Sequence, residues 1–548
     1  MRIALAQLDY IIGDFELNTA KIIATIEKCR LQGADLVVFA ELSICGYPPR
    51  DFLEFDDFIE KSYSSVNAIA AQCVDIAAIV GTPSRNPDAR GKNLFNTAWL
   101  LAGGKVEALA HKALLPTYDI FDEYRYFEPN REFSCIVYKG VSIALTICED
   151  IWNLVPDPMY VSNPMDILAE QSPDIMINIS ASPFHYGQQK TRLGILRANT
   201  SRYGIPLIYV NQVGAHTELL FDGNSCAVDR QGSIVANCTA FSEDVCLVDF
   251  DMQSKSFSGH STVQKTETGK IELIHDALVM GIKDYFTKMG FTKAILGLSG
   301  GIDSAVTIAL AAEALGSENV YAVLLPSEFS SDHSINDAVA LAENLGCKYD
   351  IISISSGYQA ILDSLGPHFG DLPFSVAEEN MQARVRAVLL MGLANKFGYI
   401  LLNTSNKSEA AVGYGTLYGD MCGGISVLGD VYKTEVYLLA QHINRSSEII
   451  PVNSIVKPPS AELRPGQKDS DSLPDYELLD QILYNYIELR QSPAALIASG
   501  FDENTVRRVL RMVNTNEWKR HQTPPILRVS PKAFGQGRRM PIVGRYLS

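Results

Sequence analysis

One short segment of the sequence has the residue types that bind phosphate groups. Residues 294–305 read AILGLSGGIDSA, in which an apolar run meets two glycines and then gives way to helix-forming residues. Gly300 and Gly301 have no Cβ, so the backbone can turn tightly there and direct its N–H groups at oxyanions. Asp303 and Ser304 fall in the first turn of the following helix, where unpaired N–H groups and the helix dipole favour phosphate. The segment therefore predicts a phosphate-binding loop between a strand and a helix.

This loop differs from two familiar phosphate loops. A Walker A loop needs a lysine that reaches the β- and γ-phosphates of a nucleotide, and the segment contains none. A dinucleotide-binding loop has the spacing GxGxxG, whereas the run that begins at Gly297 ends differently. A Gly-Gly turn before a helix can also be purely structural. The segment therefore matches neither of these two patterns.

Three residues in the first half of the chain could together hydrolyse an amide. Glu41 lies in VVFAELSICGYPPRD, Lys112 in AHKALLPTYDIFDEYRYFEP and Cys148 in IALTICEDIW, each at or just beyond the end of a β-like run. A Cys148 thiolate would attack the amide carbon, Glu41 would pass its proton to ammonia, and Lys112 would stabilise the oxyanion. Each residue alone also has an ordinary explanation, because a cysteine at the end of an apolar strand is commonly a core residue. The chemistry requires that folding bring the three side chains together.

Composition excludes several classes of protein. The chain has 548 residues, of which 47% are hydrophobic and 20% charged, as expected for a globular protein of several domains. No apolar run is long enough to span a membrane, the N-terminus reads as a strand, and the ten cysteines form no CxxC pair. The net charge of −17 argues against nucleic-acid binding. We therefore expect a cytoplasmic protein that binds neither membranes nor nucleic acid.

The positive charge of this acidic chain is concentrated near its end. From Arg507 onward there are ten Lys or Arg residues and a single acid, Glu517. Such a run is either a solvated surface or a cover for a phosphate-rich site.

The first ~250 residues alternate strand-like and helix-like segments. The strand-like runs cover residues 3–10, 35–42, 76–84, 96–103, 142–150, 175–183 and 206–214. Segments around 16–32, 57–72 and 188–204 have helical spacing. Strands covered by helices predict an α/β sandwich over residues 1–250. The polar stretch that follows has no period and predicts a linker over 251–270.

The second half predicts a different arrangement, in which βα units recur. A helix over 271–290 leads into the strand of the glycine loop, and further units follow. The strands are expected at 294–299, 320–326, 349–355 and 399–405, and the helices between them include 305–316 and 332–346. This order is typical of a doubly wound parallel sheet, in which ligands bind at the carboxyl ends of the strands. We expect this nucleotide-binding domain, with its basic C-terminal extension, to cover 271–548.

Longer stretches of the sequence resemble a known family. The string SGGIDS resembles the pyrophosphate loop of the ATP pyrophosphatases, which split ATP into AMP and pyrophosphate. The stretches 379–395, 401–436, 457–477 and the C-terminal EWKRHQTPPILRVS are similar to the glutamine-dependent NAD synthetases. The contexts of Glu41, Lys112 and Cys148 look like the catalytic centre of the nitrilase superfamily. The resemblance covers essentially the whole chain. It implies a nitrilase-like α/β/β/α sandwich followed by a doubly wound, adenine nucleotide α-hydrolase-like domain.

The resemblance also implies roles for individual residues. In the first domain, Glu41, Lys112 and Cys148 would be catalytic, and Tyr118 and Ser182 would bind glutamine. The family often has a basic residue six positions after that serine; this chain has Gln188 there, with Lys190 and Arg192 nearby, which leaves the second glutamine contact open. ATP would bind Gly297, Leu298, Ser299, Gly300, Gly301, Ile302, Asp303, Ser304 and Thr404. The substrate deamido-NAD would contact Asn380, Glu409 and Lys519; magnesium would bind Asp303 and Glu409; Arg384, Asp420 and Lys433 would be neighbours.

The implied reaction has two parts. Glutamine is hydrolysed to glutamate and ammonia in the first domain. In the second, ATP and Mg²⁺ adenylate the carboxylate of nicotinic acid adenine dinucleotide, and ammonia displaces AMP to give NAD. The resemblance further implies a sheltered path for ammonia and a homo-oligomer, and the Pro/Gly-rich segment 457–475 is a candidate lid. Two alternatives stay open at this point: an ATP-pyrophosphatase-type amidotransferase with a different carboxylate or nucleotide acceptor, and a nucleotide sensor without activity.

Overall fold

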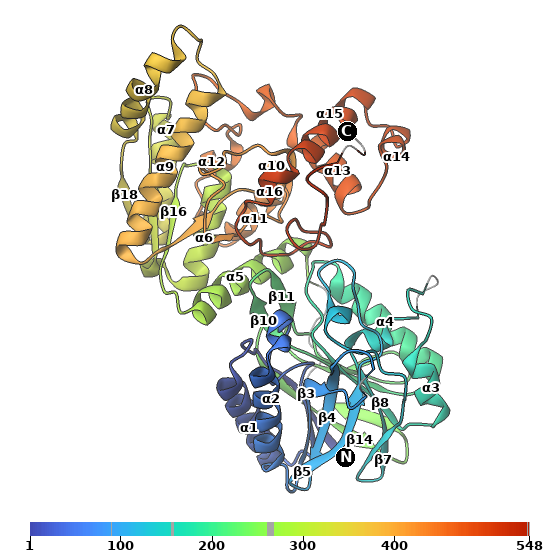
Figure 1. The fold of residues 1–548 in the computed structure, drawn as a ribbon. Coiled ribbons are helices and arrows are strands. Elements are labelled where there is room, and N and C mark those ends of the chain that lie inside the picture. Colours follow the sequence, from blue (N-terminus) through green and yellow to red (C-terminus); the bar gives the residue numbers. More distant parts are fainter. Residues whose placement is uncertain (89, 155–157, 260–267, 545, 547–548) are drawn as a thin grey trace. The chain divides into compact units, whose positions relative to one another are not determined.

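The chain folds into two compact units, Met1–Thr268 and Gly269–Ser548. The computed structural model describes all residues except 89, 155–157, 260–267, 545 and 547–548 (Figure 1). Within the predicted linker 251–270, residues 260–267 therefore lie outside the described residues. Strand β15 (Ser256–Gly259) also falls in this segment and pairs with β14 (Asp244–Asp251). The sheet of the first unit thus continues beyond residue 251. The division into a first domain over 1–250, a linker over 251–270 and a second domain over 271–548 stays a prediction.

The first unit contains two sheets. The seven-stranded sheet has the order β15-β14-β1-β2-β3-β4-β5, and the six-stranded sheet has the order β13-β12-β9-β8-β7-β6. The remaining strands of the first sheet are β1 (Arg2–Gln7), β2 (Leu36–Val38), β3 (Ala77–Arg85), β4 (Leu94–Ala102) and β5 (Lys105–His111). Those of the second are β6 (Ile136–Tyr138), β7 (Val141–Ile147), β8 (Ile175–Ser180), β9 (Leu207–Asn211), β12 (Cys226–Val228) and β13 (Ile234–Asn237). Strands β10 (Val213–His216) and β11 (Leu219–Asp222) form a separate hairpin.

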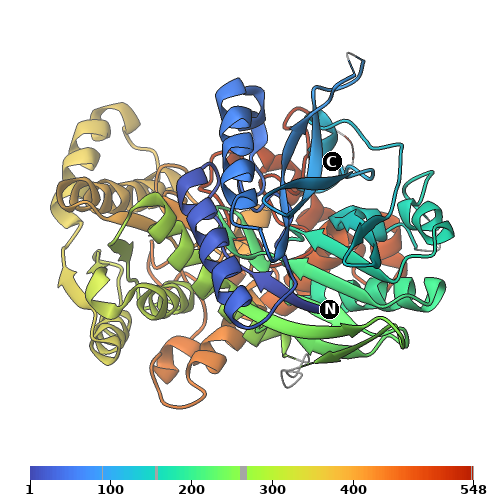
Figure 2. The same cartoon turned by 90° about the horizontal axis from the view of Figure 1, so that it is seen from below.

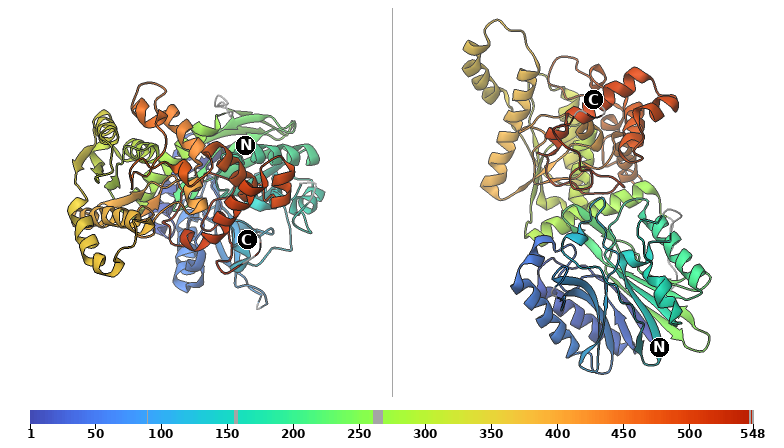
Figure 3. Two further views of the ribbon diagram at one scale, coloured as in Figure 1. Left: turned by 90° about the horizontal axis from the view of Figure 1, so that it is seen from above. Right: turned by 45° about the vertical axis from the view of Figure 1, so that its right-hand side comes forward.

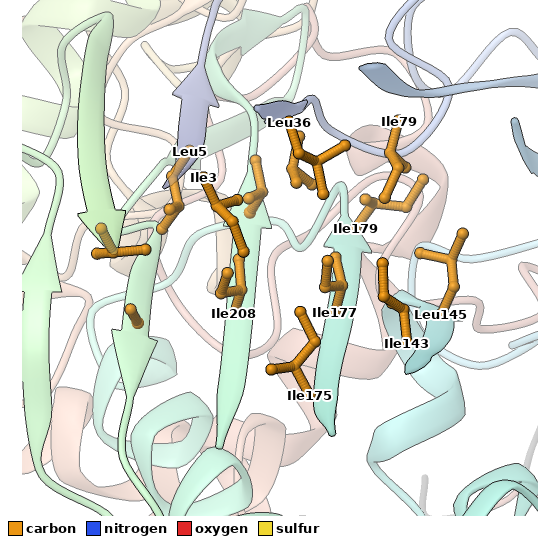
Figure 4. Packing of buried hydrophobic residues seen from close by; sticks show 14 of the residues in the cluster. Ile3, Leu5, Leu36, Ile79, Ile143, Leu145, Ile175, Ile177, Ile179 and Ile208 are labelled. Atoms are coloured by element: carbon orange, nitrogen blue, oxygen red, sulfur yellow. The ribbon is translucent and has the colours of Figure 1, made fainter. Parts of the chain in front are cut away.

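The inner faces of the two sheets form one apolar core. Figure 4 shows Ile3 of one sheet beside Ile208 of the other, and Ile79 beside Ile179. Strands β1 and β2, like β7, β8 and β9, pair in parallel and are buried on both faces, so their sequences are almost continuously apolar. This is why the sequence marks them clearly as strands.

Two pairs of helices cover the outer faces of the sandwich. Helices α1 (Phe15–Leu31) and α2 (Asp56–Ala70), which run side by side in Figure 2, pack on the seven-stranded sheet. Helices α3 (Pro164–Glu170) and α4 (Gln188–Tyr203) pack on the other sheet. The right view in Figure 3 shows the layers from the side. The predicted α/β/β/α sandwich is confirmed.

The second unit is built on a five-stranded parallel sheet of order β18-β17-β16-β19-β20, with helices on both sides in Figure 1. Its strands are β16 (Ala294–Gly297), β17 (Val320–Leu324), β18 (Lys348–Ile351), β19 (Ile400–Asn403) and β20 (Ile425–Ser426). The helices around it are α5 (Lys270–Met289), α6 (Ile302–Leu315), α7 (Asp332–Leu345), α8 (Ser355–Phe369), α9 (Val376–Phe397) and α11 (Lys433–Ile443). The predicted doubly wound architecture is therefore confirmed.

Further helices complete the second unit. They are α10 (Lys407–Val412), α12 (Val452–Val456), α13 (Tyr476–Ile487), α14 (Pro493–Ala498), α15 (Glu503–Thr515) and α16 (Glu517–Arg520). Helices α10, α13, α14 and α15 share an apolar cluster with Phe534 of the C-terminal segment. In the part of the chain that the structure describes, no helix has the length and apolar character needed to cross a membrane.

Candidate active sites

Glu41 and Lys112 meet in the interior of the first unit. Glu41 follows β2, and Lys112 comes directly after β5. The Lys112 Nζ atom donates a hydrogen bond to Oε1 of Glu41 at 2.7 Å, and both side chains are 0% exposed. The same oxygen accepts a second hydrogen bond from Asn96 Nδ2 at 2.7 Å, and Oε2 accepts one from the Ala181 N–H at 3.0 Å. Both oxygens of the predicted base are therefore held in fixed directions.

Cys148 stands at a sharp turn directly after β7. It begins the 3-10 turn Cys148–Ile151, is 5% exposed and has a φ of 45°, a left-handed conformation that is strained for a residue with a Cβ. Burial raises the pKa of its thiol well above the ordinary value; the charge of Glu41 raises it further, and that of Lys112 opposes the shift. The resting sulfur is therefore a protonated thiol, which needs a neighbouring base before it can act as a nucleophile.

Glu123 is a further member of this charged group that the sequence did not reveal. Its two oxygens accept hydrogen bonds from Lys112 Nζ at 2.9 and 2.7 Å, and Oε1 accepts another from the Tyr47 hydroxyl at 2.9 Å. Burial raises its pKa to about 7, against the effect of Lys112, and Glu41 adds to the shift. Glu123 lies in an acidic loop of the sequence, and nothing in its spacing separates it from the neighbouring acids.

Tyr118 lies beside the turn that carries Cys148. Its hydroxyl donates a hydrogen bond to Oε1 of Glu149 at 2.8 Å, and the Tyr160 hydroxyl donates to the same oxygen at 3.3 Å. The pKa of Glu149 is raised by burial, and the hydrogen bonds from the Tyr118 and Tyr160 hydroxyls oppose this shift. The first predicted glutamine contact is thus adjacent in space to the predicted nucleophile.

Three residues after Ser182 were candidates for the open glutamine contact: Gln188, Lys190 and Arg192. Gln188 Nε2 donates a hydrogen bond to Ser182 Oγ at 3.2 Å. Arg192 forms a buried ion pair with Asp222 at 2.9 Å, and Lys190 is exposed. Of these three candidates, Gln188 is the one with a hydrogen bond to Ser182 among the described contacts.

In the second unit, the glycine loop joins β16 to the N-terminus of α6. Gly300 has a φ of +79°, and a Cβ there would lie 2.2 Å from the carbonyl oxygen of Ser334. Within the loop, the Ser299 hydroxyl accepts the Gly301 N–H at 3.2 Å, and the Ser304 hydroxyl donates to the Gly301 carbonyl oxygen at 3.0 Å. The loop therefore has the predicted geometry of a tight turn at a helix start, and glycine is required at position 300.

A cavity of about 310 Å³ opens at this loop. It lies at the carboxyl ends of the strands, as expected for a doubly wound sheet. Its apolar lining includes Leu324, Leu390 and Leu401. Its polar lining includes these predicted site residues: Gly297, Ser299, Gly301, Asp303, Ser304, Thr404 and Glu409. Leu298 and Ile302 also line it, and Gly300 lies between lining residues.

Three charged side chains meet at one end of this cavity. Lys433 Nζ donates to a carboxylate oxygen of Asp303, and lies 3.5 Å from Oε1 of Glu409. Asn406 Nδ2 donates to the other Asp303 oxygen at 2.8 Å. Burial raises the pKa of Glu409 to about 8, with Asp303 adding to the shift and Lys433 opposing it. The two predicted metal ligands are thus brought together around a cation, which here is Lys433.

Two predicted substrate contacts lie away from the cavity wall. Asn380 Oδ1 accepts a hydrogen bond from the Thr416 hydroxyl at 2.6 Å. Lys519 Nζ donates to the carbonyl oxygens of Gly413 and Gly415 at 2.8 and 2.9 Å. Both therefore hold the loop 413–420. Of the neighbours named from the sequence, Arg384 Nε bonds the Leu417 carbonyl oxygen of this loop at 3.2 Å, and Asp420 accepts from the Thr416 N–H at 2.6 Å.

Residues 457–463, from the predicted lid, line the cavity. Glu462 Oε1 accepts hydrogen bonds from the hydroxyls of Ser331 and Ser334, at the N-terminus of α7, at 2.9 and 2.8 Å. Lys457 Nζ donates to the same Ser334 hydroxyl at 3.1 Å, and Gln382 of α9 binds the Leu463 carbonyl oxygen at 2.9 Å. This segment, called the strap below, is therefore attached to both α7 and α9.

Comparisons with known proteins agree with the two-part architecture. A family model described as carbon-nitrogen hydrolase matches residues 2–256, and one described as NAD synthase matches residues 274–523. The solved glutamine-dependent NAD(+) synthetase of Cytophaga hutchinsonii has a TM-score of 0.82 with this chain, covering 99% of it and 98% of the relative. At 22% identity, that likeness establishes the fold.

Closer relatives establish the family. A protein of Synechocystis sp. named glutamine-dependent NAD(+) synthetase is 46% identical over 547 residues, which is 98% of each chain. The glutamine-dependent NAD+ synthetase of Acinetobacter baumannii, solved in complex with adenosine diphosphate, is 38% identical with a TM-score of 0.79. It covers 99% of this chain, which in turn covers 98% of it. The sequence prediction is confirmed, and this chain belongs to the glutamine-dependent NAD(+) synthetase family, whose members are ligases that use glutamine as the amide donor.

Proposed function

We propose that the first unit hydrolyses glutamine through a thioester at Cys148. Glu41 takes the thiol proton as the sulfur attacks the amide carbon, and returns it to the departing ammonia. Lys112 stabilises the developing oxyanion. Water then attacks the thioester, Glu41 takes a proton from it, and glutamate leaves as the thiol is restored. The buried Lys112–Glu41 contact, together with the effect of both charges on Cys148, is the observation that carries this assignment.

We propose that Tyr118 and Ser182 bind glutamine, and that Gln188 makes the contact six positions after Ser182 that the sequence left open. Support comes from the hydrogen bonds of Tyr118 to Glu149 and of Gln188 to Ser182. An amide side chain both donates and accepts, so Gln188 can bind either the carboxylate or the ammonium end of the substrate.

In the second unit, the cavity at the glycine loop is proposed to bind ATP and the carboxylate end of deamido-NAD. The carboxylate oxygen attacks the α-phosphorus of ATP and pyrophosphate leaves; ammonia then attacks the acyl carbon, and AMP leaves as NAD forms. The loop 297–304 would bind the pyrophosphate with its N–H groups. Thr404 and Lys433 line the same cavity, and Asn380 and Lys519 would act on the dinucleotide through the loop 413–420. The relative solved with bound ADP supports a nucleotide here.

Magnesium fits the pair Asp303 and Glu409. Two carboxylates already face one cation, Lys433, and each raises the pKa of that lysine, against the effect of its burial. No group of three or more potential ligands was found within the described ranges of the chain. A site made by one or two carboxylates and completed by phosphate oxygens is the usual one for Mg²⁺. When bound, the ion would neutralise phosphate charge.

We also propose that ammonia passes from Cys148 to the adenylate without mixing with solvent, since ammonia free in water at neutral pH is mostly protonated and dilute. The test uses glutamine labelled with ¹⁵N in its amide, with a tenfold excess of unlabelled ammonium, MgATP and deamido-NAD. The proposal expects NAD, AMP, pyrophosphate and glutamate in equal amounts, and NAD that keeps most of the label. NAD with the isotope ratio of the bulk ammonium would contradict transfer, and AMP without NAD would contradict the proposed acceptor.

A cytoplasmic homo-oligomer that binds no nucleic acid completes the proposal. The net charge of −17 and ten free cysteines support the location and the lack of nucleic-acid binding. The oligomer rests on the family resemblance, and light scattering coupled to size-exclusion chromatography tests it.

A further inference from the structure

The proposed catalytic side chains of the first unit come from two different sheets. Glu41 and Lys112 follow strands of the seven-stranded sheet, whereas Cys148 follows β7 of the six-stranded sheet. The sheets face each other through apolar side chains, and apolar packing is not directional. A catalytic geometry accurate to a fraction of an ångström therefore needs directional contacts between the two sheets.

Asp150 makes such contacts beside two of the three residues. Its Oδ1 accepts hydrogen bonds from the N–H groups of Ala113 and Leu114 at 3.0 and 2.9 Å. Its Oδ2 accepts one from the N–H of Ile147 at 3.1 Å. Ala113 follows Lys112 directly, and Ile147 directly precedes Cys148. One carboxylate therefore joins the backbone at Lys112 to the backbone at Cys148.

We propose that Asp150 is a positioning residue for glutamine hydrolysis, which fixes the Cys148 turn relative to Lys112; this inference rests on the proposed catalytic roles of those two residues. Glu41 has its own link to the six-stranded sheet, because its Oε2 accepts the Ala181 N–H at 3.0 Å. Asp150 provides the corresponding link for Lys112.

The chemistry of the position requires a carboxylate. Asp150 is 2% exposed, and the three hydrogen bonds described for it all come from backbone donors. An ionised carboxylate accepts at both oxygens, whereas an amide would turn an NH₂ group toward one of the N–H donors. Burial raises the pKa of Asp150 to about 6, while its backbone hydrogen bonds and Lys112 lower it, so the side chain is ionised at neutral pH.

The test replaces Asp150 with asparagine in the full chain. Asp150→Asn keeps the size of the side chain and one accepting oxygen. We expect kcat for glutamine hydrolysis to fall about 100-fold, because a small displacement of the reacting groups has an effect of this size. The KM for glutamine should change by less than about threefold. Alkylation of Cys148 by iodoacetamide should slow as well, whereas NAD formation from ammonium should stay unchanged.

Asp174→Asn is the matched control. Asp174 accepts the N–H of Ser142 at 2.9 Å, at the opposite end of the same strand β7. This variant should keep the kcat of the unmodified chain. If Asp150→Asn does not fold, Asp150→Glu retains the charge but moves the carboxylate by one methylene, and it should lower kcat in the same way.

Each outcome has a defined meaning. A kcat of the folded Asp150 variant within twofold of the unmodified chain overturns the inference. An equal loss of kcat in the Asp174 variant overturns it too, because Asp150 would then be only one of several stabilising residues. Cys148→Ala separates this inference from the proposed function: if that variant still hydrolyses glutamine, the catalytic assignment itself is wrong.

Discussion

The ammonium group of Lys112 lies 2.7 Å from Oε1 of Glu41, with both side chains fully buried. Glu123 binds the same ammonium group at 2.7 Å. Two carboxylates thus face one lysine, and despite its burial their charges raise the pKa of Lys112 well above the ordinary value. This lysine is therefore charged at neutral pH, as an oxyanion-stabilising group must be.

Removal of this lysine should be costly for both stability and glutamine hydrolysis. Lys112→Met leaves the buried carboxylates of Glu41 and Glu123 without their counter-ion, which should lower the free energy of unfolding of the first unit by about 3–5 kcal/mol. Urea unfolding followed by alkylation of the buried Cys29 and Cys73 measures this. Lys61→Met, which removes an exposed ion pair with Asp57 on α2, is the control and should change stability by less than about 1 kcal/mol. An equal effect of the two substitutions would contradict the account.

His111, the residue before Lys112, should contribute a loss of stability to the first unit in mild acid, whereas the raised pKa values of Glu123 and Asp150 act in the opposite direction. The His111 ring stacks on Phe95 with centroids 4.4 Å apart, and burial lowers its pKa from 6.5 to about 4. At His111 the unfolded chain therefore binds a proton below pH 6.5 that the folded chain does not take up until about pH 4, so the contribution of this residue to stability falls as the pH drops through this window. The loss should amount to about 2–3 kcal/mol.

His111→Gln isolates this effect. With the substitution, the slope of unfolding free energy against pH between 6.5 and 4 should become less positive, as measured by the same alkylation of Cys29 and Cys73. An unchanged slope would contradict the contribution assigned to His111.

Gly300→Ala should stop synthesis and spare glutamine hydrolysis. The added Cβ would lie 2.2 Å from the Ser334 carbonyl oxygen, at a φ of +79° that L residues rarely adopt. We expect formation of AMP and NAD from ammonium to fall at least about 100-fold. In Gly392→Ala, on α9, the new methyl group meets nothing within 4 Å, and this variant should keep full synthesis. Normal synthesis by Gly300→Ala would refute the assigned loop geometry.

Glu462→Ala should release the strap from α7. The substitution removes the acceptor for the Ser331 and Ser334 hydroxyls, so residues 457–463 should exchange their amide hydrogens faster. Water should then reach the adenylate, and AMP should form in several-fold excess over NAD when ammonium is the nitrogen source. Glu477→Ala, at an exposed residue of α13, is the matched control and should keep the ratio near one. A ratio near one in both variants would show that Glu462 does not keep water out.

The sequence predicted the architecture well where burial leaves a local pattern. Strands such as β1, β3 and β8 are buried along most of their length, and their apolar runs stood out. The short strands β6 and β11 to β13 were missed, because three or four residues in a turn-rich stretch give no readable period. The longer strands β5 and β14 were missed as well, because charged residues interrupt their apolar runs. The segment containing β15 read as a linker because only one of its four residues, Phe257, is buried.

The same distinction applies to the candidate sites. Glu41, Lys112 and Cys148 stood out because each follows a strand within a motif, and the structure brings Glu41 and Lys112 together. The contact of Glu123 with Tyr47 spans 76 positions, that of Asp150 with Ala113 spans 37, and that of Glu462 with Ser331 spans 131. No local pattern encodes such contacts, since they arise only when the sheets and helices pack.

The division of labour between the two units is the central claim, and one pair of assays tests it most directly. Cys148→Ala is incubated with MgATP and deamido-NAD, once with glutamine and once with ammonium, beside Cys29→Ala, which alters a buried cysteine of α1. The account predicts that Cys148→Ala makes no NAD from glutamine, yet matches Cys29→Ala with ammonium. NAD formation from glutamine by Cys148→Ala, or loss of the ammonium reaction in that variant alone, would contradict it.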